Sequence, residues 1–135
     1  MTAPAGVIEG RVRGIGVDAV DVDRFRAVLG RRPGLARRLF TDDERAYAES
    51  SRDPGSRLAA RFAAKEAVLK ALGVGIGAAD FKDVEVVRDA SGAPRLAVAG
   101  RAAALAAARG VRVWHVSLTH TRLLALASVV AEGDA

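Results

Sequence analysis

The sequence predicts an α+β fold, in which mixed helices pack on a largely antiparallel sheet. Apolar segments typical of strands occur near both ends of the chain, and helical segments lie between them without a regular strand–helix alternation. Half of the 135 residues are hydrophobic, which is enough to form a core. We expect one domain over residues 12–135, preceded by a loose extension over residues 1–11.

The first predicted element is a strand over residues 12–22. Gly14 and Gly16 stand within it, where the missing side chain allows close approach of another backbone or of a ligand. Asp18 follows at the point where the strand is expected to emerge. An Asp in such a place usually caps a turn, but two later aspartates can cap the next helix, which leaves Asp18 without a structural role.

Two helices are predicted next. Asp21 or Asp23 can cap a short helix that ends at Leu29. Thr41 and Glu44 then have the spacing of a capping box, in which each side chain accepts a hydrogen bond from the backbone of the other residue. A second helix is therefore expected to begin at this point.

The middle of the chain contains the strongest helical signal. Residues 50–55 have the composition of a loop, and residues 57–72 are predicted as a helix that ends at Gly73. Strands are expected over residues 81–88 and 95–99, with a turn between them.

The last third of the chain predicts one helix and two strands. An alanine-rich helix over residues 100–109 is closed by Gly110. Apolar strands over residues 111–118 and 123–131 follow, joined by a short turn near His120. No low-complexity linker separates the predicted elements.

On a helical wheel, the segment 57–72 has apolar residues on both sides. Its large apolar residues fall in one arc, namely Leu58, Phe62, Leu69 and Leu72. The opposite side holds six alanines, a smooth surface suited to close packing against another element. We therefore expect this helix to be buried on both sides, within the domain or at a subunit contact.

The ionisable side chains of this helix are placed at a high energetic cost. Arg61 and Lys65 project into or beside the leucine arc, and Glu66 and Lys70 lie one turn apart at its boundary. Glu66 and Lys70 could form a simple i, i+4 ion pair. A bound metal ion and phosphate groups are the alternative partners, with Asp18 supplying a second carboxylate.

The charge balance favours an acidic or phosphate-bearing partner. Lys and Arg together number 21 against 16 Asp and Glu, a formal net charge of +5. The chain has no cysteine, which excludes disulfides, thiolate metal sites and thiol nucleophiles. No apolar run approaches the roughly 20 residues of a membrane span. The start of the chain also lacks a signal-peptide pattern, so we expect a cytoplasmic protein without a membrane partner.

Six arginines and no acidic residue stand between residues 24 and 38. Arg24, Val28 and Arg31 share one helical face, whose mixture of charge and apolar surface suits an acidic amphipathic helix. A solvated basic face is the simpler interpretation. Nucleic acid is disfavoured as a partner, because the stretch lacks interleaved aromatic residues for base stacking.

Four sequence segments together resemble a known family. They are Gly-Ile-Gly-Val-Asp at 14–18, Arg-Phe-Ala-Ala-Lys-Glu-Ala at 61–67, Lys-Ala-Leu-Gly at 70–73 and His-Val-Ser-Leu-Thr-His at 115–120. In this order and spacing they resemble the holo-acyl-carrier-protein synthases, the small homotrimeric type of the 4′-phosphopantetheinyl transferase superfamily. The similarity runs from about residue 12 to residue 132.

The resemblance implies a 4′-phosphopantetheinyl transferase-like fold and an activity. The 4′-phosphopantetheine of coenzyme A would be transferred to a serine of apo-acyl-carrier protein, giving holo-acyl-carrier protein and adenosine 3′,5′-bisphosphate. The resemblance also implies a homotrimer with active sites at subunit interfaces, and an acidic carrier protein that docks at Arg24, Val28 and Arg31. A small basic nucleic-acid-binding module and a structural trimeric protein are the alternatives.

Residue by residue, the resemblance assigns Mg²⁺ to Asp18 and Glu66, whose hard oxygen ligands suit that ion. The residues implied to contact coenzyme A are Arg61, Lys70, Gly73, Pro94, Thr119 and His120. Glu66, Lys70 and His120 are the implied catalytic residues, with His120 or a water held by Glu66 or the metal as the proton acceptor. Thr121 stands where some relatives have an acidic residue, so the role of that acid cannot be carried over.

Overall fold

A computed structural model describes residues 10–134 of the chain. The elements in chain order are β1 (Arg11–Asp21), α1 (Val22–Arg31), α2 (Leu35–Leu39), α3 (Asp42–Glu49), α4 (Pro54–Ala71), the 3₁₀ turn η1 (Phe81–Asp83), β2 (Val84–Arg88), β3 (Pro94–Val98), α5 (Gly100–Ala108), β4 (Val113–His120) and β5 (Leu124–Gly133). The extension expected over residues 1–11 lies outside the described residues, except for Gly10 and Arg11, and Arg11 opens β1.

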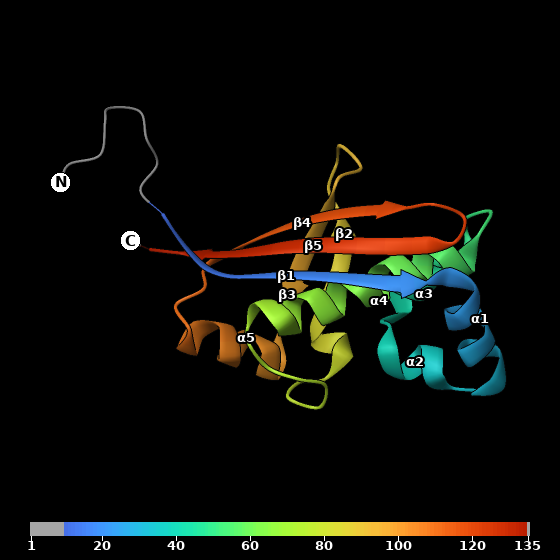
Figure 1. Ribbon diagram of the computed structural model, residues 1–135, viewed down its shortest axis with the longest axis horizontal. Coiled ribbons are helices and arrows are strands. Elements are labelled where there is room, and N and C mark those ends of the chain that lie inside the picture. Colours follow the sequence, from blue (N-terminus) through green and yellow to red (C-terminus); the bar gives the residue numbers. More distant parts are fainter. Residues whose placement is uncertain (1–9, 135) are drawn as a thin grey trace.

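The strands form two antiparallel sheets. One sheet has the strand order β1-β5-β4, and the other is the β2-β3 hairpin. Helix α4 packs along one face of the three-stranded sheet, while α1 and α2 lie at the end where β1 finishes and α5 lies at the opposite end (Figure 1). The predicted α+β fold with a largely antiparallel sheet is confirmed.

Strand β1 lies directly on the backbone of α4. A Cβ atom built on Gly16 would stand 1.9 Å from the Ala67 carbonyl oxygen, and one built on Gly14 would stand 1.9 Å from that of Ala71. Only a residue without a side chain fits at these two positions. The glycines of the strand and the alanines of the helix are therefore the two halves of one close contact, made within the chain.

Two hydrophobic clusters share the ends of α4. The larger one joins the alanine face of α4 to the three-stranded sheet, the β2-β3 hairpin and α5. The smaller one joins α1, α2 and α3 to the first turns of α4, and its Phe62 lies 5.1 Å from Phe25 and stacks at 5.4 Å on Phe81 of the larger cluster. These three aromatic residues lie beside the carboxylates described below.

The structure differs from the sequence-based expectation in three elements. Residues 81–83 form a 3₁₀ turn rather than the start of a strand. Helix α4 begins inside the expected loop, because Pro54 occupies its first turn and Asp53 caps it. Helix α2 was not expected; its five residues follow Gly34, which adopts a positive φ of 86°. The capping box of Thr41 and the Asp21 cap are both present.

The outer face of the three-stranded sheet is uncovered in the single chain. Ile15 is 67% exposed and Val17 is 54% exposed on β1, and Val113 on β4 is also exposed. These residues alternate with inward-facing neighbours that contact α4. No helix within the described part of the chain has the length and apolar character needed to cross a membrane.

Candidate active site

Asp18 reaches α4 because of the glycines that precede it. Side chains two residues apart in a strand point to the same face, so Asp18 follows Gly14 and Gly16 toward the helix. Its side chain is largely buried, with 13% exposed. The close backbone contact of β1 with α4 thus brings this carboxylate beside the last two turns of the helix.

Lys70 links the helix to the strand. Its ammonium group lies 3.0 Å from Asp18 Oδ1 and also donates to the Val17 carbonyl oxygen at 3.0 Å. The simple ion pair of Lys70 with Glu66 is not found among residues 10–134, and Lys70 pairs with Asp18 of β1 instead. Because Lys70 is about half exposed, its ammonium group remains accessible to a ligand.

Glu66 stands one turn before Lys70 on the same helix. Burial raises the pKa of the Glu66 carboxyl above its usual 4.5, the negative charge of Asp18 raises it further, and Lys70 opposes both effects. Two carboxylates from distant segments therefore repel each other at this point. A cation bound between them would relieve that repulsion.

The residues present fit a hard divalent cation such as Mg²⁺. Within residues 10–134, no group of three or more His, Asp or Glu side chains is arranged to hold a metal ion, and Asp18 and Glu66 form a pair of neighbouring carboxylates. Mg²⁺ is commonly held by one or two carboxylates, with waters and substrate phosphates as its other ligands. A two-carboxylate site suits an ion that is shared with a phosphate-bearing substrate.

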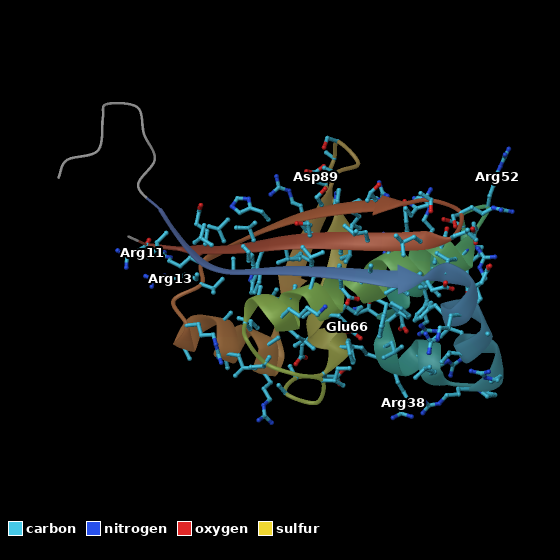
Figure 2. All side chains as sticks on the ribbon, viewed as in Figure 1. Arg11, Arg13, Arg38, Arg52, Glu66 and Asp89 are labelled. Carbon is cyan, nitrogen blue, oxygen red and sulfur yellow. The ribbon has the colours of Figure 1, made fainter. Side chains whose placement is uncertain are left out.

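Both carboxylates line one groove of about 660 Å³. Arg24 and Val28 of α1 stand on the same groove, together with Arg32 rather than the expected Arg31. Its apolar walls come from Phe25, Leu35, Leu39, Phe62, Ile76, Phe81 and Leu124. Figure 2 shows Glu66 on α4 near the middle of the molecule, whereas Arg52 stands at the end where β4 turns into β5.

Arg61 lies in a different hollow. It is only 3% exposed, its guanidinium carbon lies 4.3 Å from the centre of the Tyr47 ring, and Arg88 approaches the same ring at 4.9 Å. Burial lowers the pKa of Arg61. Its Nε has no hydrogen-bond partner among the residues that the structure describes. In a single chain, then, Arg61 does not line the groove that holds Glu66.

His120 lies at the β4-β5 turn, in a third hollow. Its neighbours there include Arg52, Arg57 and Arg122. Thr121 closes the turn, because its hydroxyl oxygen accepts hydrogen bonds from the backbone nitrogens of residues 123 and 124. In this chain the residue after the His therefore shapes a turn.

The remaining predicted coenzyme A residues lie on further surfaces. Gly73 ends α4 with a positive φ of 70°, and its nitrogen donates to the Lys70 carbonyl oxygen. Pro94 opens β3 in a hollow with Trp114. Thr119 stands on the exposed face of β4. One chain thus brings Asp18, Glu66, Lys70, Arg24 and Val28 together, and leaves the other predicted site residues apart.

Comparison with known proteins adds the decisive finding. The family model of the 4′-phosphopantetheinyl transferase superfamily matches residues 14–126. The chain belongs to this superfamily. It is 54% identical to the holo-[acyl-carrier-protein] synthase of Clavibacter michiganensis subsp. michiganensis, over 92% of this chain and 98% of that one. It is also 54% identical to the synthase of Frankia casuarinae, over 90% of this chain and 98% of that one.

Solved structures agree with this membership of the phosphopantetheinyl transferase superfamily. The holo-[acyl-carrier-protein] synthase of Neisseria meningitidis has a TM-score of 0.81 and 32% identity, covering 90% of this chain and 98% of that one. The synthase of Bacillus anthracis, in complex with CoA (3′,5′-ADP), has a TM-score of 0.76 and 32% identity, covering 91% and 98%.

Some features of this phosphopantetheinyl transferase could not be found from the motifs. Tyr47 and Arg88 join Arg61 from α3 and β2, and the aromatic walls of the groove come from three separate elements. Lys65 was expected to lie in or beside the leucine arc with no partner identified, and the structure pairs it inside the protein with Glu44. The capping-box motif signalled Glu44 only as a residue that begins a helix.

Proposed function

We propose that the chain is a holo-acyl-carrier-protein synthase, which transfers 4′-phosphopantetheine from coenzyme A to a serine of apo-acyl-carrier protein. The products are holo-acyl-carrier protein and adenosine 3′,5′-bisphosphate. The observation that carries the proposal is the meeting of Asp18 and Glu66 in one groove, with Lys70 paired to Asp18 and each of the three residues on a family motif. The names of the relatives and the CoA complex of the Bacillus anthracis synthase support it.

Asp18 and Glu66 are proposed to hold Mg²⁺. When bound, the ion would neutralise charge on the pyrophosphate of coenzyme A and on the departing bisphosphate. Lys70 donates to Asp18 from a position that leaves its ammonium group half exposed, so it can add positive charge to the same phosphates. Arg61 and His120 are proposed as further phosphate contacts.

The serine hydroxyl must lose its proton as its oxygen attacks the phosphorus that carries pantetheine, while the bond from that phosphorus to the bisphosphate breaks. Glu66 is the better placed proton acceptor, acting through a bound water, because it lines the groove whereas His120 lies in another hollow of the same chain.

The carrier protein is proposed to dock on α1. Arg24, Val28 and Arg32 stand on the groove that ends at the two carboxylates, and Arg31 closes the same helix. Their positive charge and the apolar residues between them suit an acidic amphipathic helix. A carrier bound there would present its serine to the groove.

A homotrimer with interfacial active sites is also proposed. The exposed apolar residues of the outer sheet face, including Ile15 and Val17, suit contact with another subunit. Thr119 stands on that face, and the other predicted coenzyme A residues are spread over separate hollows. Assembly of subunits would let hollows of neighbouring chains form one site. A cytoplasmic location stays a prediction.

Mass spectrometry of an apo-acyl-carrier protein tests the proposal. Incubation with the enzyme, coenzyme A and Mg²⁺ should add about 340 Da, the phosphopantetheinyl group, and EDTA should prevent the gain. Asp18→Asn should abolish the gain, whereas Asp23→Asn, on the exposed first turn of α1, should not. No gain on any acidic carrier would leave a nucleic-acid-binding or structural role to be tested.

A further inference from the structure

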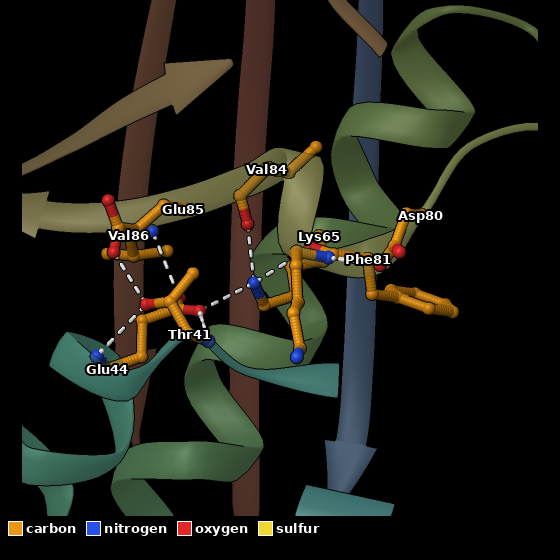
Figure 3. A network of polar contacts seen from close by, with 9 residues as sticks. Thr41, Glu44, Lys65, Asp80, Phe81, Val84, Glu85 and Val86 are labelled. Atoms are coloured by element: carbon orange, nitrogen blue, oxygen red, sulfur yellow. Dashed lines mark hydrogen bonds and ion pairs between the residues drawn. The ribbon is translucent and has the colours of Figure 1, made fainter. Parts of the chain in front are cut away.

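A buried ion pair precedes the metal-site glutamate by one residue. Lys65 is 0% exposed and Glu44 is 1% exposed. The Lys65 ammonium nitrogen lies 2.7 Å from Glu44 Oε1 (Figure 3). Neither side chain lines the groove, so neither has a part in the reaction described above.

The Lys65 ammonium group also holds the backbone of η1 and of the first residue of β2. It donates to the Phe81 carbonyl oxygen at 2.9 Å and to the Val84 carbonyl oxygen. All three of its hydrogens are thereby used. Glu44 completes the connection, because its Oε2 accepts from the Val86 nitrogen at 3.0 Å.

This anchor follows a segment that is rich in glycine. Gly73, Gly75 and Gly77 all occur between the end of α4 and η1, and glycine gives a backbone the most conformational freedom. Phe81 is the first residue of η1 after this stretch. Its carbonyl oxygen accepts hydrogen bonds from Lys65 and from the backbone nitrogen of Val84, so the ammonium group is one of the two donors that hold this part of the backbone.

Phe81 in turn forms a wall of the proposed active-site groove. Its ring stacks on Phe62 at 5.4 Å and lines the groove together with Asp18 and Glu66. Phe62 stands one helical turn before Glu66. The position of the apolar wall next to the carboxylates therefore depends on the position of the Phe81 backbone.

A buried ion pair is a poor way to gain stability alone. Well-packed apolar residues of similar volume often stabilise a core as well or better. The Lys65 ammonium nitrogen lies 5.5 Å from the centre of the Phe40 ring, and a Met side chain has the length of the Lys65 stem. What apolar residues cannot do is hold two backbone carbonyl groups at a fixed place.

We propose that Lys65 is a positioning residue, which ties Phe81 in place and so sets the wall of the groove against which the carrier protein lies. This inference rests on the proposed function of the groove. It assigns to Lys65 an effect on carrier binding, and none on the binding of metal or coenzyme A.

The test compares Lys65→Met/Glu44→Gln with Glu44→Gln, at a temperature where circular dichroism shows all variants folded. The double variant removes both buried charges and the carbonyl anchor, and its KM for apo-carrier protein should rise about tenfold. Glu44→Gln keeps Lys65 on the two carbonyl groups, so its KM should stay at the wild-type value even if its melting temperature falls. Mg²⁺ affinity by calorimetry should be unchanged in both.

Phe81→Ala keeps the proposal falsifiable if the double variant does not fold. It should raise the KM for carrier protein by a similar factor, and adding it to the double variant should cause no further rise. A wild-type KM in folded Lys65→Met/Glu44→Gln or in Phe81→Ala, additive effects, or loss of Mg²⁺ affinity would each overturn the proposal. Absence of transfer by the wild-type enzyme would instead refute the proposed function itself.

Discussion

The contact between β1 and α4 predicts a large effect of Gly16→Ala. The new Cβ would stand 1.9 Å from the Ala67 carbonyl oxygen, 2.9 Å from its carbon and 3.0 Å from the Ala71 nitrogen. All three are backbone atoms, so no side chain can rotate away. Ordinary contact begins at 3.4 Å, and 3.4 minus 1.9 leaves a separation of about 1.5 Å to be found by moving the strand.

Such overpacking costs about 3 kcal/mol of the free energy of unfolding. For a chain of this length that corresponds to a melting temperature about 10 °C lower, measured by calorimetry. Asp18 stands two residues after Gly16 on the same face and would move away from Glu66 with the strand. A misplacement of about 1 Å at a reacting site can cost on the order of 100-fold in rate.

The matched control is Gly30→Ala on α1. A Cβ at Gly30 meets nothing within 4 Å, so this variant should keep its activity and be as stable as the wild type or more so. Transfer is to be measured well below both melting temperatures. A Gly16→Ala protein with wild-type stability would refute the packing argument. A destabilised variant with full activity would refute the link between strand position and Asp18.

Three further predictions follow from the charges of the groove. Glu66→Gln should raise the melting temperature of the metal-free protein at neutral pH and should abolish transfer. The pKa of Glu66 is higher in the folded state than in the unfolded state, so Glu66 favours folding while it is protonated and opposes folding as pH rises and it ionises. Mg²⁺ affinity, measured by calorimetry, should weaken as pH falls through the raised pKa of Glu66, because bound metal requires the carboxylate. Arg24→Glu should raise the KM for carrier protein about tenfold and leave that for coenzyme A unchanged. Arg101→Glu on α5, with the same charge change at an exposed site, should leave both unchanged.

Local rules predicted the parts of the site that depend on spacing within a segment. The wheel of residues 57–72 showed that Glu66 and Lys70 lie at the edge of an apolar helix without a wet face, and most of that helix is buried. The glycines of β1 indicated a close approach, which the structure assigns to the backbone of α4. Both signals arise from the periodicity of a single element.

Periodicity within one element could not predict which side chains of distant segments pair. Lys70 is paired with Asp18, 52 residues away, and Lys65 with Glu44, 21 residues away. The helical period offered Glu66 as the partner of Lys70, because only local neighbours are visible in a sequence. Helix α2 was missed for another reason: Leu35 and Leu39 have helical spacing, but five residues are too few for that spacing to identify a helix.

The division of α4 into three faces explains why it has almost no solvent face. Its alanine face meets the strand β1 through backbone contacts, which place Asp18 beside the helix. Lys65 points to the η1–β2 segment and ties its backbone. Glu66, between these two faces, opens onto the groove. Glu66, the carboxylate of α4, therefore lies between two contacts with backbone atoms, one made by the alanine face and one made by Lys65. Backbone atoms are the least able to adapt to a substitution.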